Sequence, residues 1–366
     1  MDVIYLDYRK AFDTVPHKRL LKKLKDLGIS GQLLRWIESF LTDRTIRVRV
    51  GNDFSAWMRV LSGVPQGSVL GPLLFLLFVN EIPDWVLNNI LMFADDTKIW
   101  RGVGKMEDGE SLQEDLNRLM EWSSRWLLRF NAEKCKVMHV GHSFQTVYTL
   151  TDEGKTYKLQ EIREEKDLGV YTTDNLKPSL QCSKAAGKAM SILGMINRNF
   201  KHIDTEDFQI LYKVFVRPHL EYCVQAWSPY YRKDVDCLER VQRRATGMVR
   251  GMKNKSYTER LQILRITSLE RRRQRGDLIE MYKILTGREC IDSNKFFQLA
   301  DSEYNLRGHS LKLFKPRCRL SSRLHAFSQR SIDIWNALPQ AVIAATSVNN
   351  FKSRLDEFWK CTDAGN

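Results

Sequence analysis

The sequence predicts an α+β fold whose second half is mainly helical. Three observations predict it. Short apolar runs of strand length end at Asp7 and at the pair Asp95-Asp96. Around these runs, apolar residues recur at the spacing of amphipathic helices. After about residue 180, helical spacing dominates, as at Ala185, Ala189 and Ile196.

The chain begins with an apolar run that suits a buried strand and that Asp7 ends. Pro16 suits the first turn of a helix over residues 16–27, and Gly28 suits the position just beyond its end. Ser30 can cap a second helix that continues to about residue 40. We expect this second helix to bury one face, made of Leu33, Leu34, Ile37 and Leu41.

A hairpin and a core helix are predicted next. Apolar side chains alternate with arginines from Ile46 to Val50, which is typical of a half-buried strand. Residues 51–53 suit a turn into a second strand at 57–61. The apolar run 69–79 is too short to span a bilayer, which needs about 20 residues, and we expect a buried helix.

A second hairpin and two longer helical stretches follow. Apolar runs on both sides of Asp95-Asp96 predict two strands joined by a tight acidic turn. Residues 108–128 have the helical pattern, with Leu112, Leu116, Leu119 and Met120 facing inward. In the second half, Val235, Leu238, Val241, Ala245 and Val249 repeat at helical spacing, with arginines on the opposite face.

The charge is strongly basic and unevenly distributed. The 366 residues carry a formal net charge of +14. Residues 1–150 hold 20 Lys and Arg against 18 Asp and Glu, whereas residues 151–366 hold 38 against 26. Residues 240–330 alone hold 22 basic and 8 acidic side chains, including Arg271-Arg272-Arg273. A basic surface can serve solubility alone, but such clusters favour a polyanionic partner.

The cysteines and the apolar runs exclude some protein classes. The seven cysteines are scattered and odd in number, which favours reduced thiols in an intracellular protein. No CxxC pair and no Cys/His spacing suits a zinc site. The sequence shows no secretory signal and no run long enough for a membrane span.

Asp7, Asp95 and Asp96 are the candidate site. Three carboxylates held close together repel one another unless cations neutralise them. Carboxylate oxygens that bind a metal ion together with substrate phosphates favour Mg²⁺. Polymerases and nucleases use two such ions in catalysis. The alternative for the Asp95-Asp96 pair is simple turn chemistry, because Asp is common in turns.

Several longer motifs, taken in order, resemble the reverse transcriptase of non-LTR (LINE-type) retrotransposons, close to the jockey-like branch. Those up to the acidic hairpin are Tyr5–His17, Gly63–Phe75 and Phe93–Asp96. Phe130–Lys136 and the primer-grip turn Asp167–Val170 follow, and Arg217–Tyr222 and Trp335–Pro339 resemble the region beyond the polymerase. Ordered motifs are more specific than any single one.

The resemblance implies a polymerase palm and assigns roles to its residues. Asp7 and Asp95 would bind two Mg²⁺ ions, with Mn²⁺ as a substitute, and Asp96 would assist. Tyr8 would offer mainly its backbone carbonyl. The ions would act in the attack of a primer 3′-hydroxyl on a deoxynucleoside triphosphate.

The remaining site residues each have a simpler alternative. Phe12 resembles the aromatic gate that excludes a ribose 2′-hydroxyl, and core packing would also explain it. Gln66 and Gly67 resemble the positions beside the nascent base pair, and a polar loop would also explain Gln66. Lys134 resembles a proton donor to the leaving pyrophosphate, with Lys136 as a rival and a solvated lysine as the alternative.

The resemblance also sets the expected organisation. We expect a palm over residues 1–175, a helical thumb over 176–285 and a basic C-terminal extension over 286–366. The family's basic fingers region would precede Asp7, so we expect an N-terminally truncated fragment that holds the triphosphate poorly.

The expected partners are an RNA template, a DNA primer and deoxynucleoside triphosphates, without a membrane, in an intracellular ribonucleoprotein of the nucleus or cytoplasm. A nucleic-acid-binding remnant without catalysis is one alternative. A group II intron maturase and an RNA-directed RNA polymerase are others. Phe12 argues against the RNA polymerase, and Trp335–Pro339 favours a retrotransposon over a maturase.

Overall fold

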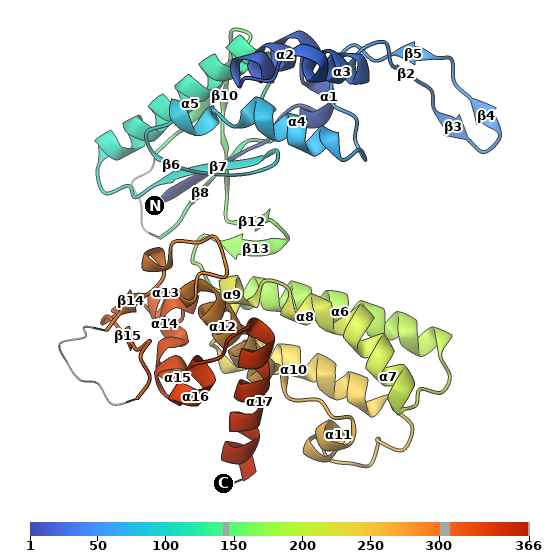
Figure 1. Ribbon diagram of the computed structural model, residues 1–366, viewed down its shortest axis with the longest axis vertical. Coiled ribbons are helices and arrows are strands. Elements are labelled where there is room, and N and C mark those ends of the chain that lie inside the picture. Colours follow the sequence, from blue (N-terminus) through green and yellow to red (C-terminus); the bar gives the residue numbers. More distant parts are fainter. Residues whose placement is uncertain (142–145, 301–307, 365–366) are drawn as a thin grey trace. The chain divides into compact units, whose positions relative to one another are not determined.

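The computed structural model describes residues 1–141, 146–300 and 308–364. It contains two compact units, Met1–Glu165 and Lys166–Asn366. The first combines a sheet with helices and the second is mainly helical, which confirms the α+β class (Figure 1). The finer division into palm, thumb and extension stays a prediction.

The first unit is built on a five-stranded sheet with the order β11-β8-β1-β7-β6. Its strands are β1 (Asp2–Leu6), β6 (Asn89–Phe93), β7 (Asp96–Arg101), β8 (Lys136–His139) and β11 (Gln160–Ile162). The central strand β1 runs antiparallel to both β7 and β8, and β6 is antiparallel to β7. The predicted strand before Asp7 and the predicted acidic hairpin are therefore confirmed.

Helices cover one face of this sheet (Figure 1). They are α1 (Ala11–Thr14), α2 (His17–Asp26), α3 (Gly31–Leu41), α4 (Leu70–Val79), the short η1 (Ile82–Trp85) and α5 (Met106–Trp126). The core lies between the helices and the sheet, where Ile4 and Leu6 meet Phe75, Leu116 and Trp122. Burying such apolar side chains is the main stabilising contribution to the fold.

Most of the helix predictions for this unit are confirmed. The four residues predicted to face inward on α5 are all buried, and α4 forms where the apolar run predicted it. One prediction for α3 is wrong, because Leu33 is 56% exposed while Ile37 and Leu41 are buried. The reason is geometric: Leu33 lies one residue before Leu34, so a helix turns the two side chains about 100° apart.

The first predicted hairpin forms, but its predicted burial is wrong. Strands β2 (Thr45–Ile46) and β5 (Met58–Arg59) pair, as do β3 (Arg49–Val50) and β4 (Asp53–Phe54). Every residue from Thr45 to Arg59 is exposed. Alternating apolar and polar residues indicate burial only where another layer covers one face. Here the ribbon extends away from the helices and sheet of its unit (Figure 1).

Between β8 and β11, the first unit contains β9 (Thr149–Asp152) and β10 (Lys155–Lys158), which form a hairpin packed beside α5. Strands β12 (Glu164–Asp167) and β13 (Val170–Thr173) follow as a separate two-stranded sheet. Leu168 and Gly169 form the turn between them, and both have positive φ.

After β13, the second unit contains a set of helices around one core. They are α6 (Ser179–Asn199), α7 (Thr205–Leu211), the π-helical η2 (Tyr212–Val216), α8 (Arg217–Glu221), α9 (Val224–Trp227), α10 (Arg232–Gly247) and α11 (Tyr257–Ile263). Ala185, Ala189 and Leu193 of α6 face Leu238 and Val241 of α10, as their spacing predicts.

A second core in this unit gathers around α12 (Leu269–Leu285) and α17 (Val348–Ala364). Between them lie η3 (Ser293–Lys295), β14 (Gln298–Leu299), β15 (Leu313–Phe314), α13 (Ser321–Leu324), α14 (Phe327–Arg330), α15 (Ile332–Asn336) and α16 (Gln340–Ile343). Trp335 is fully buried at its centre. In the described ranges, no helix is both long and apolar enough to cross a membrane.

A buried histidine should make this second core sensitive to acid. His309 donates from Nε2 to the carbonyl of Trp335 (3.0 Å), and its Nδ1 accepts from the Leu311 amide (3.2 Å). Only the neutral ring can do both. Burial lowers the pKa of His309, and the charge of Lys312 acts in the same direction.

In the unfolded chain, His309 takes up a proton near pH 6.5, and in the folded chain only at lower pH. The stability that the neutral ring of His309 contributes is therefore present above pH 6.5. It is lost as the pH falls towards the pKa of His309 in the folded chain. Urea unfolding should give a smaller free energy of unfolding at pH 5.5 than at pH 7.5. The difference between the two pH values should be smaller in His309→Gln. His202→Gln, at an exposed site, should leave the difference unchanged. An identical loss in His309→Gln would refute the prediction.

Candidate active site

The strand register brings two of the predicted carboxylates together. Leu6 of β1 pairs with Thr97 of β7, so the next residue on each side places Asp7 beside Asp96. Leu6 and Thr97 are both buried, so the alternation along a strand turns Asp7 and Asp96 to the other, more open face. Asp95 precedes Asp96 directly, in the turn between β6 and β7.

That turn is tight. Phe93 pairs with Asp96, so only Ala94 and Asp95 join the two strands. Ala94 has φ of 54°, a left-handed backbone that is uncommon for a residue other than glycine. Such strained positions persist only where the surrounding structure enforces them, and they gather at functional sites.

Asp7 is held by the segment that follows α5. Its carbonyl accepts from the Asn131 amide (2.7 Å), and its own amide contacts Sγ of Cys135 (3.5 Å). Arg9 extends the pairing, with its amide on the carbonyl of Arg129 (2.8 Å). Burial raises the pKa of Cys135 to about 11, so this thiol stays protonated at neutral pH. The backbone around Asp7 is thus fixed from a distant part of the chain.

Tyr8 turns its ring into the core. Its ring stacks on Phe130, with ring centroids 4.5 Å apart, and only 4% of the residue is exposed. Burial raises the pKa of its hydroxyl well above the usual value. The side chain is therefore unsuited to bind a solvated cation, and the backbone carbonyl is what Tyr8 can offer.

Lys134 lies beside Asp7, with Nζ 3.4 Å from Oδ2. Its rival Lys136 forms an ion pair with Glu165 at 2.8 Å. Of the two lysines, Lys134 is therefore the one that the structure brings to a predicted catalytic carboxylate. Both Lys134 and Asp7 are well exposed, so we expect this ion pair to contribute little to stability.

The metal-binding prediction fits the donors, although the side chains do not form a closed site. In the described ranges, no three His, Cys, Asp or Glu side chains lie close enough together to hold a metal ion. The donor set is nevertheless one that a hard cation prefers, namely carboxylate oxygens with the Tyr8 carbonyl nearby. Asp7 already attracts one cation, the ammonium group of Lys134.

The loop that carries Gln66 and Gly67 is fastened to α1. The amides of Gly63 and Val64 donate to the carbonyls of Val15 and Phe12, both at 2.8 Å. Gln66 donates from Nε2 to Oδ1 of Asp13 (3.0 Å). Sequence reasoning assigned Asp13 no role, because nothing in the local sequence reveals this contact across 53 positions.

Glycines explain why this loop lies so close to its neighbours. A Cβ on Gly63 would lie 2.6 Å from the carbonyl oxygen of Asp13, and one on Gly71 would lie 2.3 Å from that of Pro65. Gly67 has φ of +82° with open space around it. Gly67 is therefore required by its backbone conformation and Gly71 by close packing, whereas Gly63, with φ of +89°, is required by both.

Phe12 is half-buried and stacks on Phe75 of α4, with ring centroids 4.5 Å apart. The packing interpretation is therefore satisfied in part, and the exposed remainder leaves room for a role at the surface. The role of Phe12 beneath the sugar stays a prediction.

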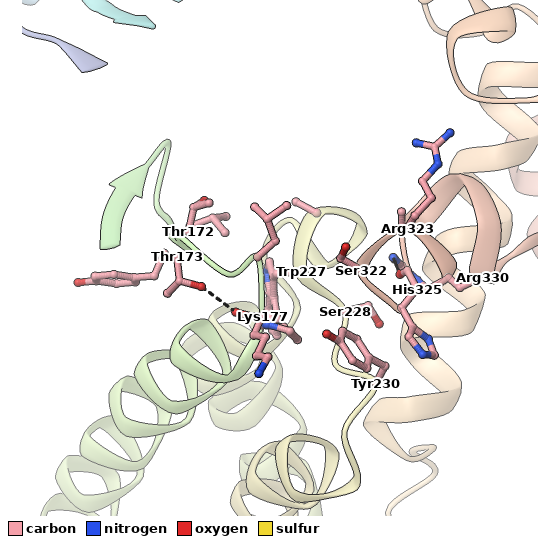
Figure 2. A pocket seen from close by; sticks show the side chains of 16 residues that line it. Thr172, Thr173, Lys177, Trp227, Ser228, Tyr230, Ser322, Arg323, His325 and Arg330 are labelled. Atoms are coloured by element: carbon pink, nitrogen blue, oxygen red, sulfur yellow. Dashed lines mark hydrogen bonds between the residues drawn. The ribbon is translucent and has the colours of Figure 1, made fainter. Parts of the chain in front are cut away.

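The second unit contains a pocket that sequence reasoning missed (Figure 2). Its volume is about 380 Å³, and it lies between β13, the start of α6, the segment after α9 and the region of α13. Tyr230 and His325 stack in it with centroids 4.2 Å apart. Burial raises the pKa of Tyr230 to about 12 and lowers that of His325.

Two of the cationic side chains that line this pocket, Arg330 and Arg323, are paired or turned outward. Arg330 is neutralised by Asp277 at 2.9 Å. The guanidinium of Arg323 points away from the other labelled side chains (Figure 2). Because the lining segments are far apart in sequence, no local pattern could have predicted the pocket.

A family comparison matches residues 3–195, more than half of the chain, to "Reverse transcriptase (RNA-dependent DNA polymerase)". Among curated proteins, the chain is 38% identical over 142 residues to the RNA-directed DNA polymerase from mobile element jockey of Drosophila melanogaster. It is 30% identical over 263 residues to the same-named protein of Drosophila funebris. These alignments cover 36% and 68% of this chain.

The chain spans only 15% and 28% of the lengths of those two relatives. Among solved structures, telomerase from Candida albicans, determined with a fragment of telomeric RNA, matches with a TM-score of 0.36 at 12% identity. That match covers 73% of this chain and 50% of the telomerase chain, and it is too weak to add to the assignment. The family match, the two relatives and the ordered motifs show that this chain belongs to the reverse transcriptases of jockey-like non-LTR retrotransposons.

Proposed function

We propose that this chain carries the catalytic palm of an RNA-directed DNA polymerase, with Asp7, Asp95 and Asp96 as ligands of two Mg²⁺ ions or of Mn²⁺ in their place. The observation that supports this most directly is the register that sets Asp7 beside Asp96 at the end of an acidic hairpin. Bound ions would lower the pKa of the primer 3′-hydroxyl and neutralise charge on the triphosphate.

The chain's own residues position these groups. The backbone pairing of Asp7 with Asn131 fixes the carboxylate at the strand end, and the Tyr8 carbonyl lies next to it in the chain. Lys134 lies close enough to Asp7 to donate a proton to a leaving pyrophosphate bound there. Since positioning supplies much of the rate in phosphoryl transfer, the fixed backbone matters as much as the charges.

We place the incoming nucleotide over α1 and the loop fastened to it. Asp13 orients the amide of Gln66, which can then present its remaining donor and acceptor to a base pair. Gly67 has no side chain to obstruct a close approach. Phe12 would lie under the sugar, held from below by Phe75.

The template and primer are the proposed partners, and the basic second unit is their proposed contact. Arg240, Arg243 and Arg244 are exposed on α10, opposite its buried face. Contacts of this kind bind phosphates without reading sequence. A ribonucleoprotein inside the cell is the setting that we propose for this activity.

The test is Mg²⁺-dependent extension of an oligo-dT primer on poly-rA. It should be run on this chain and on the chain joined to the upstream segment of the Drosophila funebris relative, because the alignment covers 28% of that protein. Extension that a chelator stops would support the proposal. Salt-dependent binding without extension in either form would instead favour a nucleic-acid-binding protein without catalysis.

Phe12→Ala should raise the incorporation of ribonucleotides relative to deoxyribonucleotides. An aromatic ring under the sugar leaves no space for a 2′-hydroxyl, and steric conflicts of this size typically cost about 1–3 kcal/mol. Competition between rATP and dATP on a poly-dT template would measure the ratio. Phe12→Tyr keeps the ring and should keep the ratio. If Phe12→Ala leaves the ratio unchanged, Phe12 serves only to pack on Phe75.

A further inference from the structure

Strands β2–β5 form a ribbon over residues 45–59, which we call the arm. The fold of the first unit does not explain the arm. All of its residues are exposed, and the core of the unit contains none of them. A two-stranded ribbon without a covering layer is only marginally stable. Large apolar side chains are nevertheless on its surface, with Trp57 61% and Val50 74% exposed. Such a surface indicates an interaction site.

One face of the arm combines arginines with aromatic rings. The guanidinium carbon of Arg47 lies 3.9 Å from the ring centroid of Phe54 and 4.5 Å from that of Trp57. Arg49 lies over Phe54 at 5.5 Å and pairs with it across the ribbon. These contacts place the guanidinium groups over the rings, and a guanidinium has five N–H donors with which it can also bind a phosphate.

The charge of the arm is unbalanced. Residues 44–59 hold four arginines and a single acidic residue, Asp53. Within the described part of the chain, Arg47 and Arg59 form no ion pair, and Arg49 donates only to the carbonyl of Gly51. Arg44 anchors the base of the arm, with Nη2 3.0 Å from the carbonyl of Gly63 in the loop that carries Gln66. The arm is thus attached directly beside the candidate nucleotide site.

We propose that the arm binds single-stranded nucleic acid through Arg47, Arg49, Arg59, Phe54 and Trp57. The arginines supply charge complementary to a phosphodiester backbone, and the exposed rings supply stacking surface for unpaired bases. The choice of nucleic acid as the polyanion rests on the proposed function. The binding itself requires neither metal nor catalysis.

The test measures binding of a fluorescent single-stranded oligonucleotide to the full chain over a range of salt concentrations. Replacing Arg47, Arg49 and Arg59 together by Gln should weaken binding. It should also make the slope of log K against log salt less negative by about 2, because single strands contribute about 0.7 per neutralised phosphate. The matched control replaces Lys18, Lys22 and Lys25, exposed on α2, by Gln. It removes the same charge and should leave binding nearly unchanged.

Trp57→Leu separates stacking from charge. It should weaken binding about tenfold while leaving the salt slope unchanged, since it removes a ring and no charge. A further variant deletes residues 45–59 and joins Arg44 to Val60, whose backbone atoms already pair at 2.9 Å, through an Asn-Gly turn. It should fold, because no core residue is lost, and it should bind more weakly than the arginine variant, because it removes the rings as well as the charges.

Unchanged affinity in the arginine and deletion variants would overturn the proposal. Equal losses in the arginine variant and the α2 control would also overturn it, because they would reflect net charge alone. Asp96→Asn should bind normally. If no variant of the chain extends a primer but binding still depends on the arm, the proposed catalytic function fails and the arm proposal stands.

Discussion

Replacing Asp7, Asp95 or Asp96 by Asn is expected to abolish primer extension while leaving nucleic-acid binding intact. Asn keeps the shape of the side chain and removes the charge that a divalent cation needs. Loss of a residue that only supports a metal ligand typically costs 10- to 100-fold, so loss of a ligand should cost more than about 100-fold. Extension on poly-rA, in the form of the chain that shows activity, measures the loss.

The matched control is Asp26→Asn at the exposed end of α2, which makes the same chemical change away from the sheet. It should extend at the rate of the unmodified chain. Full extension by Asp95→Asn would contradict its assignment as a ligand. A parallel loss of oligonucleotide binding would show that the substitution disturbed the fold instead of the chemistry.

In the first unit, the sequence predicts well the elements that local patterns determine. Strand β1, the acidic hairpin and α5 form where apolar spacing places them, because each buries a face against one common core. The order of the motifs then indicates the family. The register that sets Asp7 beside Asp96 joins two strands far apart in the chain, and it comes from the structure alone.

The features that could not be predicted depend on what lies across space. The alternation from Ile46 to Val50 is the same whether or not another layer covers the strand, so it could not reveal an exposed arm. Lys134 and Lys136 are two positions apart, and the sequence could not tell which of them lies at the site. The structure distinguishes them, because Lys134 lies beside Asp7 and Lys136 pairs with Glu165. The contact of Gln66 with Asp13 joins segments that no local pattern relates.

Gly63→Ala is expected to destabilise the first unit and to impair the nucleotide loop. Gly63 has φ of +89°, and an added Cβ would lie within 2.7 Å of three backbone atoms of Asp13. Backbone cannot swing aside as a side chain can, and here the amides of Gly63 and Val64 hold the loop to α1. The loop must therefore separate from α1, which would also move Gln66 away from Asp13.

Gly28→Ala is a closely matched control, because Gly28 also has φ of +89° but has open space around it. Backbone strain alone should cost Gly28→Ala about 1–2 kcal/mol. Gly63→Ala should cost about 1–3 kcal/mol more, the usual range for overpacking. Urea unfolding of both variants measures the difference, which isolates the close contact with Asp13 from the strain that the two share. Equal costs would mean that the loop relaxes without leaving α1. In that case Gln66 would keep its hydrogen bond to Asp13 even with a side chain at position 63.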